Sequence, residues 1–302
     1  MTNIKSTINS KVPQNDMKVV KKKRSQWTEV WRRLKQNKAA MVGLFIIGVL
    51  IFSAVFADLI APEGYDDQDL HRRFIPPGKD HILGTDHLGR DILSRIIYGS
   101  RISLQVGFIA VGIAAITGGS LGAIAGYYGR RLDNIIMRIM DVLLAIPSIL
   151  LAISIVAALG ANLVNVMIAV GIASIPSYAR IVRASVLTIK DEEFIEAAQA
   201  IGANDFRIII KHILPNAMAP IIVQATLGVA GAILSAAGLS FIGLGIQPPK
   251  PEWGAMLSAG RHYIRDHWHI ATFPGLAIMI TIFGLNLFGD GLRDALDPRL
   301  KN

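Results

Sequence analysis

The stretch RIVRASVLTIKDEEFIEAAQAIGANDFRIIIKHILP occupies residues 180–215 and is the longest polar interval in the second half of the chain. Apolar runs long enough to cross a lipid bilayer flank it on both sides. Within it, Phe194, Ala197, Ala198 and Ile201 recur at helical spacing and give one narrow apolar face. The pattern predicts a short amphipathic helix in a polar loop between two membrane spans.

Local signals predict where this helix ends and where a second one begins. Asp191 can cap the first helix, and Gly202 can adopt the positive φ that ends it. Asn204 or Asp205 can cap the second helix, which Pro215 is expected to end or kink. The stretch therefore predicts two helices joined by a tight turn.

The stretch also contains Glu196-Ala197-Ala198, then Gly202 four positions after Ala198, and later Leu214-Pro215. This pattern resembles the EAA loop of permease subunits in ATP-binding-cassette importers. That pattern has an Ile two places before its Leu-Pro pair, where this chain has His212. In the family this loop docks in a cleft of a cytoplasmic ATPase subunit, so the resemblance implies a coupling role. From the residues alone, a plain helical hairpin remains the alternative. The residues assigned to coupling are Glu196, Ala197, Ala198, Ile201, Gly202, Ala203, Asp205, Leu214 and Pro215.

The composition favours a polytopic membrane protein. Of the 302 residues, 52% are hydrophobic and 18% are charged, whereas soluble domains usually have about a quarter charged residues. The chain has no cysteine, which excludes disulfides, thiolate catalysis and Cys-ligated metals. The net charge is +9, but the basic residues lie beside the apolar runs, where they determine topology. We therefore expect no nucleic-acid partner.

The N-terminal part is a basic tail followed by a span. Residues 1–36 include a basic run at 21–24 and lack the features of a secretory signal peptide, and we expect residues 1–24 to be disordered. From Trp27 onward, apolar and basic residues take opposite helical faces, which favours an interfacial amphipathic helix. Residues 37–61 form the first predicted span, and the basic residues before it indicate a cytoplasmic N-terminus.

Residues 62–101 form a predicted external loop, which leads into LGTDHLGRDILSRIIYGSRISL at 83–104. The charged residues of that segment could pair with one another where the chain re-enters the membrane. The segment resembles the one before the second span in the C-type permease subunit of dipeptide, oligopeptide and nickel importers. A solvated, charge-rich connector is the alternative. The signature residues are Gly84, Thr85, Asp86, Gly89, Arg90 and Asp91, and the charged ones also include Arg95 and Arg101.

Residues 102–290 are expected to form a core of five further spans, which makes the whole chain an all-α membrane protein with six transmembrane helices. Residues 291–302 form a predicted cytoplasmic tail. The core includes a cytoplasmic coupling loop at 178–215 and an external loop at 246–269. The predicted spans lie at 102–127, at 135–159, from 163 to about 176, at 216–244 and at 271–288.

Several residues within these spans have a predicted role. Gly118, Gly122 and Gly126 form a row of small residues that permits close helix approach. Asp141 lies inside a span, where Arg138 one turn earlier offers a partner; a structural ion pair is favoured over a functional acid.

The external loop 246–269 contains aromatic and histidine residues. The aromatic ones suit a membrane-interface belt. The histidines could bind a metal, but without an acidic cluster we favour surface histidines at the headgroup boundary and assign no metal site. These residues are Trp253, Tyr263 and Trp268, and His262, His267 and His269.

Motifs for catalysis are missing from the sequence. It contains no G-x-x-x-x-G-K-[ST], H-E-x-x-H or G-x-S-x-G motif. We therefore expect no enzyme activity and no cofactor bound by this chain, with ATP used by partner subunits.

The resemblance covers nearly everything after residue 25 and implies the type I importer permease fold, with both termini cytoplasmic, in a bacterial plasma membrane. It implies one of two permease subunits of an ATP-driven importer of di- or oligopeptides. The implied partners are a second homologous permease, two cytoplasmic ATPases, an external solute-binding protein and membrane lipids. Import of nickel or another small solute is an alternative, and an ion-driven secondary transporter is another, although no inverted repeat or chain of intramembrane charges supports it.

Overall fold

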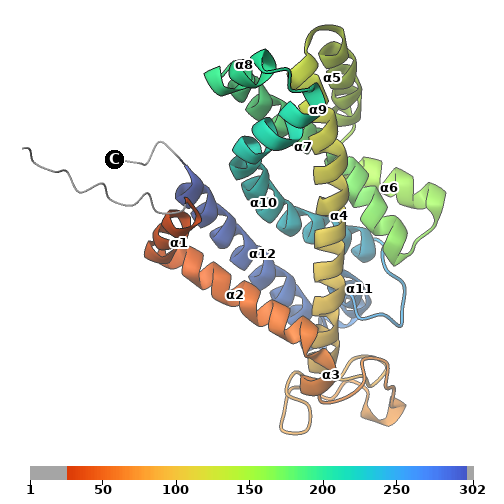
Figure 1. Ribbon diagram of the computed structural model, residues 1–302. Coiled ribbons are helices and arrows are strands. Elements are labelled where there is room, and N and C mark those ends of the chain that lie inside the picture. Colours follow the sequence, from red (N-terminus) through yellow and green to blue (C-terminus); the bar gives the residue numbers. More distant parts are fainter. Residues whose placement is uncertain (1–25, 298–302) are drawn as a thin grey trace, which may run out of the picture.

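The structure is a computed structural model that describes residues 26–297, and the regular structure of this part is helical (Figure 1). The predicted tail at 1–24 and the last residues of the C-terminal tail lie outside the described residues. The longer helices are α1 (Gln26–Gln36), α2 (Lys38–Val55), α4 (Ile92–Tyr128), α5 (Arg130–Ala145), α6 (Ser148–Leu159), α7 (Leu163–Ile189), α8 (Glu193–Ala200), α10 (Leu214–Phe241), α11 (Trp253–Gly260) and α12 (His269–Leu296). Short helices are α3 (Ala57–Ile60), α9 (Asp205–Ile208), two 3-10 turns (Leu70–Arg72 and Arg261–Tyr263) and a π-helical turn (Ile209–Ile213).

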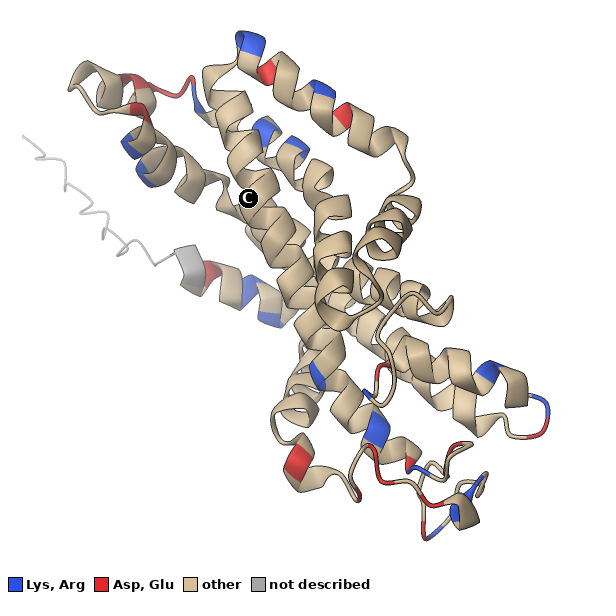
Figure 2. Cartoon of the chain, turned by 90° about the vertical axis from the view of Figure 1, so that its right-hand side faces the viewer, with Lys and Arg blue, Asp and Glu red and all other residues tan. Residues whose placement is uncertain are grey.

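Five helices in the described part of the chain are long and apolar enough to cross a membrane. They are α2, α4, α7, the continuous run Asp205–Phe241 and α12. Figure 1 shows α8 and α9 near one end of α4, and the loop after α3 at the other. Apart from those on α1, charged residues gather toward these two ends, and few lie in the helical region between them (Figure 2).

The third predicted span, at 135–159, is bent. Helices α5 and α6 meet at an angle of 87°, so this span is not one straight helix. Pro147 lacks an N–H donor and disfavours helical backbone in the residue before it. Ile146 accordingly takes extended angles, φ −94° and ψ 125°. Counting the bent pair as one span gives six.

Three predicted spans are longer in the structure. Helix α4 begins at Ile92, ten residues before the predicted start, and α7 continues past Pro176 to Ile189. Helix α12 continues to Leu296, so much of the predicted C-terminal tail is helical. Apolar composition alone does not predict these helix ends, because the additional helical residues are largely polar. The first predicted span divides instead into α2 and α3 at Phe56.

The glycine row packs α4 against α7, as predicted. A Cβ on Gly118 or Gly122 would press into the carbonyl oxygens of Ile175 and Ala179, respectively. A Cβ on Gly126 would lie 2.8 Å from the Cβ of Val186. The main hydrophobic core lies beside this contact, between α4, α6, α7 and α10, and includes Val106, Val156, Val170 and Ile233.

Helix α1 confirms the predicted N-terminal helix and packs against the end of α12. Leu34 is buried with Ala40 and Ala295, while Trp31 on the same helix is exposed. On its polar side, Arg32 donates a 2.5 Å hydrogen bond to Glu29. The helix therefore has one buried edge and one charged edge.

Candidate functional site

The candidate site is the segment at 190–215, which we call the α8–α9 segment. Helix α7 enters it without the predicted break near Pro176, and α9 leaves it through the π-helical turn into α10. Pro215 does not end the second helix, because it occupies the first turn of α10, where a missing N–H costs little. The segment thus joins two long helices directly.

The turn inside the segment follows the local sequence signals closely. Gly202 has φ +79°, and its N–H donates to Gln199 O at 2.9 Å. Ala203 N–H donates to Ala198 O at 3.1 Å, which completes the Schellman pattern of a helix C-terminus. Asn204 accepts from Arg207 N–H at 2.8 Å and so caps α9, as predicted.

The start of α8 differs from its prediction. Glu192, not Asp191, is the N-cap residue, and within the described structure its side chain makes no capping hydrogen bond. Three neighbouring acids at 191–193 made the choice ambiguous in the sequence. Their charge still lies at the helix N-terminus, where the helix dipole favours it.

The apolar face predicted from the spacing is mostly exposed. Ile195 and Ala198 are the buried residues of α8. Phe194 is 43% exposed and Ile201 86% exposed, and Phe206 on α9 is 74% exposed. We call Phe194, Ile201 and Phe206 the apolar patch. The sequence did not single out Phe206, because the exposure of a side chain on a short helix becomes visible only in the fold.

Buried residues pack the α8–α9 segment against neighbouring helices. Ile195 and Ala198 pack with Val186 on α7 and with Ile208 and Ile213 on the following helix. The side chain of Asp205 also accepts a 2.9 Å hydrogen bond from Tyr127 at the end of α4. The patch is therefore displayed on a structured support.

Two ion pairs connect α5 to α7 below the segment. Asp133 accepts two hydrogen bonds from Arg183, at 2.5 and 2.6 Å. Asp141 pairs with Arg180 at 2.7 Å. The predicted partner Arg138 is therefore wrong for Asp141, because α7 remains helical here and brings Arg180 across. Both arginines were expected in a loop.

The other assigned residues occupy different parts of the segment. Glu196 and Ala197 are exposed on α8, Ala203 and Leu214 are half-buried, and Pro215 is exposed. Gly202 and Ala203 form the turn between α8 and α9, whereas Leu214 and Pro215 begin α10. The segment carries exposed apolar side chains on an ordered helical turn.

The second predicted signature builds the start of α4 at the opposite end of the molecule. Gly84 and Gly89 have φ +79° and +76°. The carboxylate of Asp86 accepts from Arg90 Nε at 2.8 Å. Asp91 caps α4 by accepting from Ser94 N–H at 2.7 Å and lies 3.0 Å from His81 Nδ1. The predicted internal pairing is thus partly confirmed.

Arg101, Trp253 and His269 depart from prediction. Arg101 pairs with Asp58 on α3 at 2.8 Å, outside the signature. Trp253 is buried, and its Nε1–H donates to Ile96 O at 3.1 Å, so it does not belong to an interface belt. His269 is also buried, 3.2 Å from Thr85 O, rather than at the surface. Gly99 makes room for the Trp253 ring.

Comparison with protein families gives two matches. Residues 118–302 match the family described as binding-protein-dependent transport system inner membrane component. Residues 25–77 match the N-terminal TM domain of oligopeptide transport permease C. The first match covers more than half of the chain, and the second begins with α1.

Similar sequences extend over nearly the full length. The chain is 53% identical over 278 residues to the dipeptide transport system permease protein DppC of Alkalihalophilus pseudofirmus, covering 92% of this chain and 91% of that protein. It is 47% identical over 282 residues to the di/tripeptide transport system permease protein DppC of Pseudomonas aeruginosa, covering 91% and 92%. It is 49% identical over 283 residues to the glutathione transport system permease protein GsiD of Pectobacterium atrosepticum, covering 92% and 93%.

A solved structure shares the fold. The MetNI methionine ABC transporter in an inward-facing conformation has a chain that matches with a TM-score of 0.56 at 20% identity, covering 67% of this chain and 96% of that chain. The helical architecture is therefore that of a type I importer permease. The chain belongs to the binding-protein-dependent transport system inner membrane components, as a C-type permease subunit of the dipeptide, oligopeptide and nickel importer class.

Proposed function

We propose that this chain forms half of the pathway of an ATP-driven peptide importer and transmits the work of cytoplasmic ATPase subunits through the α8–α9 segment. The solute is inferred from the relatives, whose names specify dipeptides, tripeptides and glutathione. The observation that carries the coupling role is the apolar patch, because exposed aromatic and aliphatic side chains on an ordered support favour a protein contact.

The support beneath the patch gives a route for the force. ATP binding closes the two ATPases and displaces the docked α8–α9 segment as a rigid body. Because α7 and the run Asp205–Phe241 continue from the segment as helices, its displacement tilts both spans. The Asp133–Arg183 pair makes α5 move with α7. Alternating access follows from these linked tilts.

Glu196 and Gly202 have separate roles in the proposed coupling. Glu196 is exposed on α8 and holds the ATPase by a charged hydrogen bond. Gly202 sets the angle between α8 and α9 through its positive φ. ATP itself is bound by the partners, and this chain supplies no nucleotide site of its own.

The assembly that fits this role has a second homologous permease, two ATPases and an external solute-binding protein. The chain lies in the bacterial plasma membrane with both termini in the cytoplasm. The α8–α9 segment then faces the ATPases, and the loop at 62–91 faces the binding protein.

The test uses the assembled transporter in liposomes, with peptide uptake and ATP hydrolysis measured together. A Cβ at position 202 would meet no atom within 4 Å in the described structure, so substitutions there act through the backbone. Gly202→Val should lower ATP-dependent uptake strongly, because a β-branched residue at positive φ costs about 1–2 kcal/mol. Gly202→Asn is the matched control and should keep most uptake, since Asn tolerates this conformation.

If this chain without any ATPase subunit took up peptide as well as the assembled transporter does, the importer assignment would be refuted. Normal uptake and normal ATPase assembly by Gly202→Val would refute only the role of the turn. Uptake of nickel in place of peptides would change the solute and leave the coupling scheme standing.

A further inference from the structure

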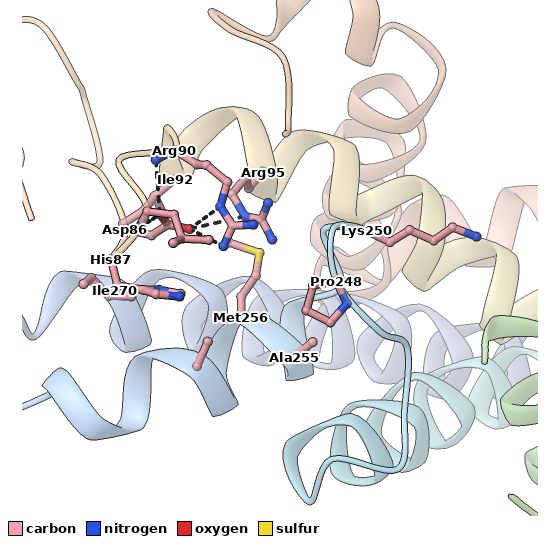
Figure 3. Close-up of a pocket in the computed structure, with 12 residues that line it drawn as sticks. Asp86, His87, Arg90, Ile92, Arg95, Pro248, Lys250, Ala255, Met256 and Ile270 are labelled. Carbon is pink, nitrogen blue, oxygen red and sulfur yellow. Dashed lines mark hydrogen bonds and ion pairs between the residues drawn. The ribbon is translucent and has the colours of Figure 1, made fainter. Parts of the chain in front are cut away.

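A cavity of about 110 Å³ lies at the end of the molecule opposite the α8–α9 segment. The first turn of α4 and the turn before it form one wall, and the loop before α11 and α11 itself form the other (Figure 3). Arg90 and Arg95 lie side by side above the sulfur of Met256 and the ring of Pro248. The signature LGTDHLGRD of the sequence therefore builds one side of a partly open chamber.

The charges of this chamber do not balance. Asp86 supplies one carboxylate against two guanidinium groups, with Arg90 at 2.7 Å and Arg95 Nε at 3.8 Å. Asp86 already accepts hydrogen bonds from the backbone N–H of Leu88 and Arg90 and from Arg90 Nε. Among the described residues, the two arginines thus share Asp86 as their one carboxylate within 4.0 Å, so one positive charge has no close carboxylate of its own.

Arg95 is the arginine with the weaker pairing: its Nε lies 3.8 Å from Asp86, and Asp66 attracts it only as a further Coulomb partner. Its side chain is 5% exposed, and its Nε finds no hydrogen-bond acceptor in the described part of the chain. Its Nη1 is occupied by the carbonyl of Tyr65 at 2.7 Å and reaches toward that of Pro249 at 3.5 Å. The carbonyls fix the guanidinium in place but carry no net charge. Lys250 does not change this balance, because its ammonium points away from the two arginines (Figure 3).

A second polar atom of the lining also lacks a partner. His87 Nδ1 is buried and unbonded within residues 26–297. Burial lowers the pKa of His87 below its ordinary value, so the ring is neutral near pH 7 and offers one N–H. Two unsatisfied nitrogens in one small chamber are costly unless a ligand meets them.

We propose that this chamber, the Arg90–Arg95 pocket, binds the carboxylate group of a small molecule. A carboxylate matches the planar donor fork of arginine and cancels the surplus charge. The apolar wall formed by Met256, Ala255 and Ile270 lowers the local dielectric and strengthens that pairing. A cavity of about 110 Å³ admits a carboxylate with a short apolar stem.

The carboxylate has two sources that share this chemistry. One is a free monocarboxylate such as acetate. The other is the terminal carboxylate of a transported peptide, and this second assignment rests on the proposed function. Binding to the folded protein raises Tm in proportion to the logarithm of ligand concentration, so both sources are measurable by the same method.

The experiment uses the full chain, purified in detergent with the subunits that accompany it. Sodium acetate replaces sodium chloride up to about 100 mM at constant ionic strength, which should raise Tm by about 2–4 °C once the concentration is well above Kd. Arg95→Gln removes the surplus charge, and Ala255→Leu fills the chamber while leaving both arginines. Both variants should lose the shift.

Lys250→Gln is the matched control, since it removes a charge from the lining that does not face the arginines, and it should keep the full shift. Dialanine and dialanine amide then identify the source. A shift with dialanine but not with its amide assigns the peptide terminus, whereas a shift with acetate alone assigns a free monocarboxylate.

The proposal is overturned if neither acetate nor dialanine raises Tm in the wild-type assembly, or if Ala255→Leu shifts as much as the wild type. If Arg95→Gln fails to fold, Ala255→Leu and Lys250→Gln still decide the matter. Acetate binding requires no transport, so a failure of peptide uptake would count against the proposed function and not against this pocket.

Discussion

Replacing Gly122 with alanine tests whether the contact of α4 with α7 is as tight as the fold requires. The new Cβ would lie 3.0 Å from the backbone nitrogen of Arg183 and closer still to the carbonyl oxygen of Ala179. Both atoms belong to the backbone of α7, so no side-chain rotation can relieve the contact. Restoring ordinary separations of about 3.5 Å requires the helices to part by roughly 0.5–1 Å.

The magnitude follows from two opposing terms. Overpacking costs about 1–3 kcal/mol, whereas Ala in place of Gly inside a helix gains up to about 1 kcal/mol. Gly119→Ala isolates the second term, because its Cβ would meet only Val182 Cγ2, at an ordinary 3.8 Å. We expect Gly122→Ala to be less stable than Gly119→Ala by about 1–3 kcal/mol.

The assay is reversible denaturant unfolding of the two variants and the wild type in the same detergent. Gly119→Ala should match or exceed the wild type. Equal stability of the two variants, to within about 0.5 kcal/mol, would refute the close α4–α7 contact. Equal stability would also remove the support for a rigid α4–α7 connection through which α7 is proposed to transmit motion.

Three further predictions concern charged and titrating side chains. Burial lowers the pKa of His87 from its ordinary 6.5, so the stability it contributes is fully present above about pH 6.5 and is lost as pH falls through the lower folded pKa. We therefore expect Tm to decrease on acidification, and to decrease less in His87→Phe, as followed by thermal unfolding in a pH series; an identical slope in both proteins would contradict this. Asp133→Asn removes an ion pair with Arg183 in which the carboxylate is only 15% exposed, and should cost about 1 kcal/mol in denaturant unfolding. Asp141→Asn disrupts a pair with Arg180 that is about half exposed on both sides, and should change stability by less than about 0.5 kcal/mol; the reverse order of the two effects would show that burial does not set their strength.

The sequence predicts the features of this molecule that depend on neighbouring residues. The turn after α8 follows from Gly202 and Asn204, because a positive φ and a side-chain cap are local requirements. The row Gly118, Gly122 and Gly126 likewise marks a close contact before the partner helix is known. Both predictions are confirmed.

Features that depend on distant residues could not be predicted in the same way. Which side of α8 is exposed depends on the packing of Ile195 against Val186. The spacing of residues within α8 does not predict this contact. Burial of Trp253 depends on Gly99, which is far away in sequence. The bend at Pro147 had a local signal, but the apolar composition on both sides favoured one span.

The unbalanced charge at Arg95 is a further example. In the sequence, Asp86, Asp91, Arg90 and Arg95 look like a neutral set. In the fold Asp91 turns away to cap α4 and meet His81, which leaves Asp86 between two arginines. The imbalance arises because Asp91 pairs elsewhere, and Asp86 alone remains close to both arginines.

The central claim is that the apolar patch docks on an ATPase inside the cell. Because the chain contains no cysteine, a single cysteine can be placed at Ile201, which is 86% exposed, or as a control at Leu59 on α3, which is 81% exposed. We expect Ile201→Cys to crosslink to an ATPase subunit in the working assembly and to resist an impermeant maleimide added outside intact cells. Leu59→Cys should form no such crosslink and should react with the maleimide. Labelling of Ile201→Cys from outside, or its failure to crosslink to any ATPase in an active transporter, would contradict the account.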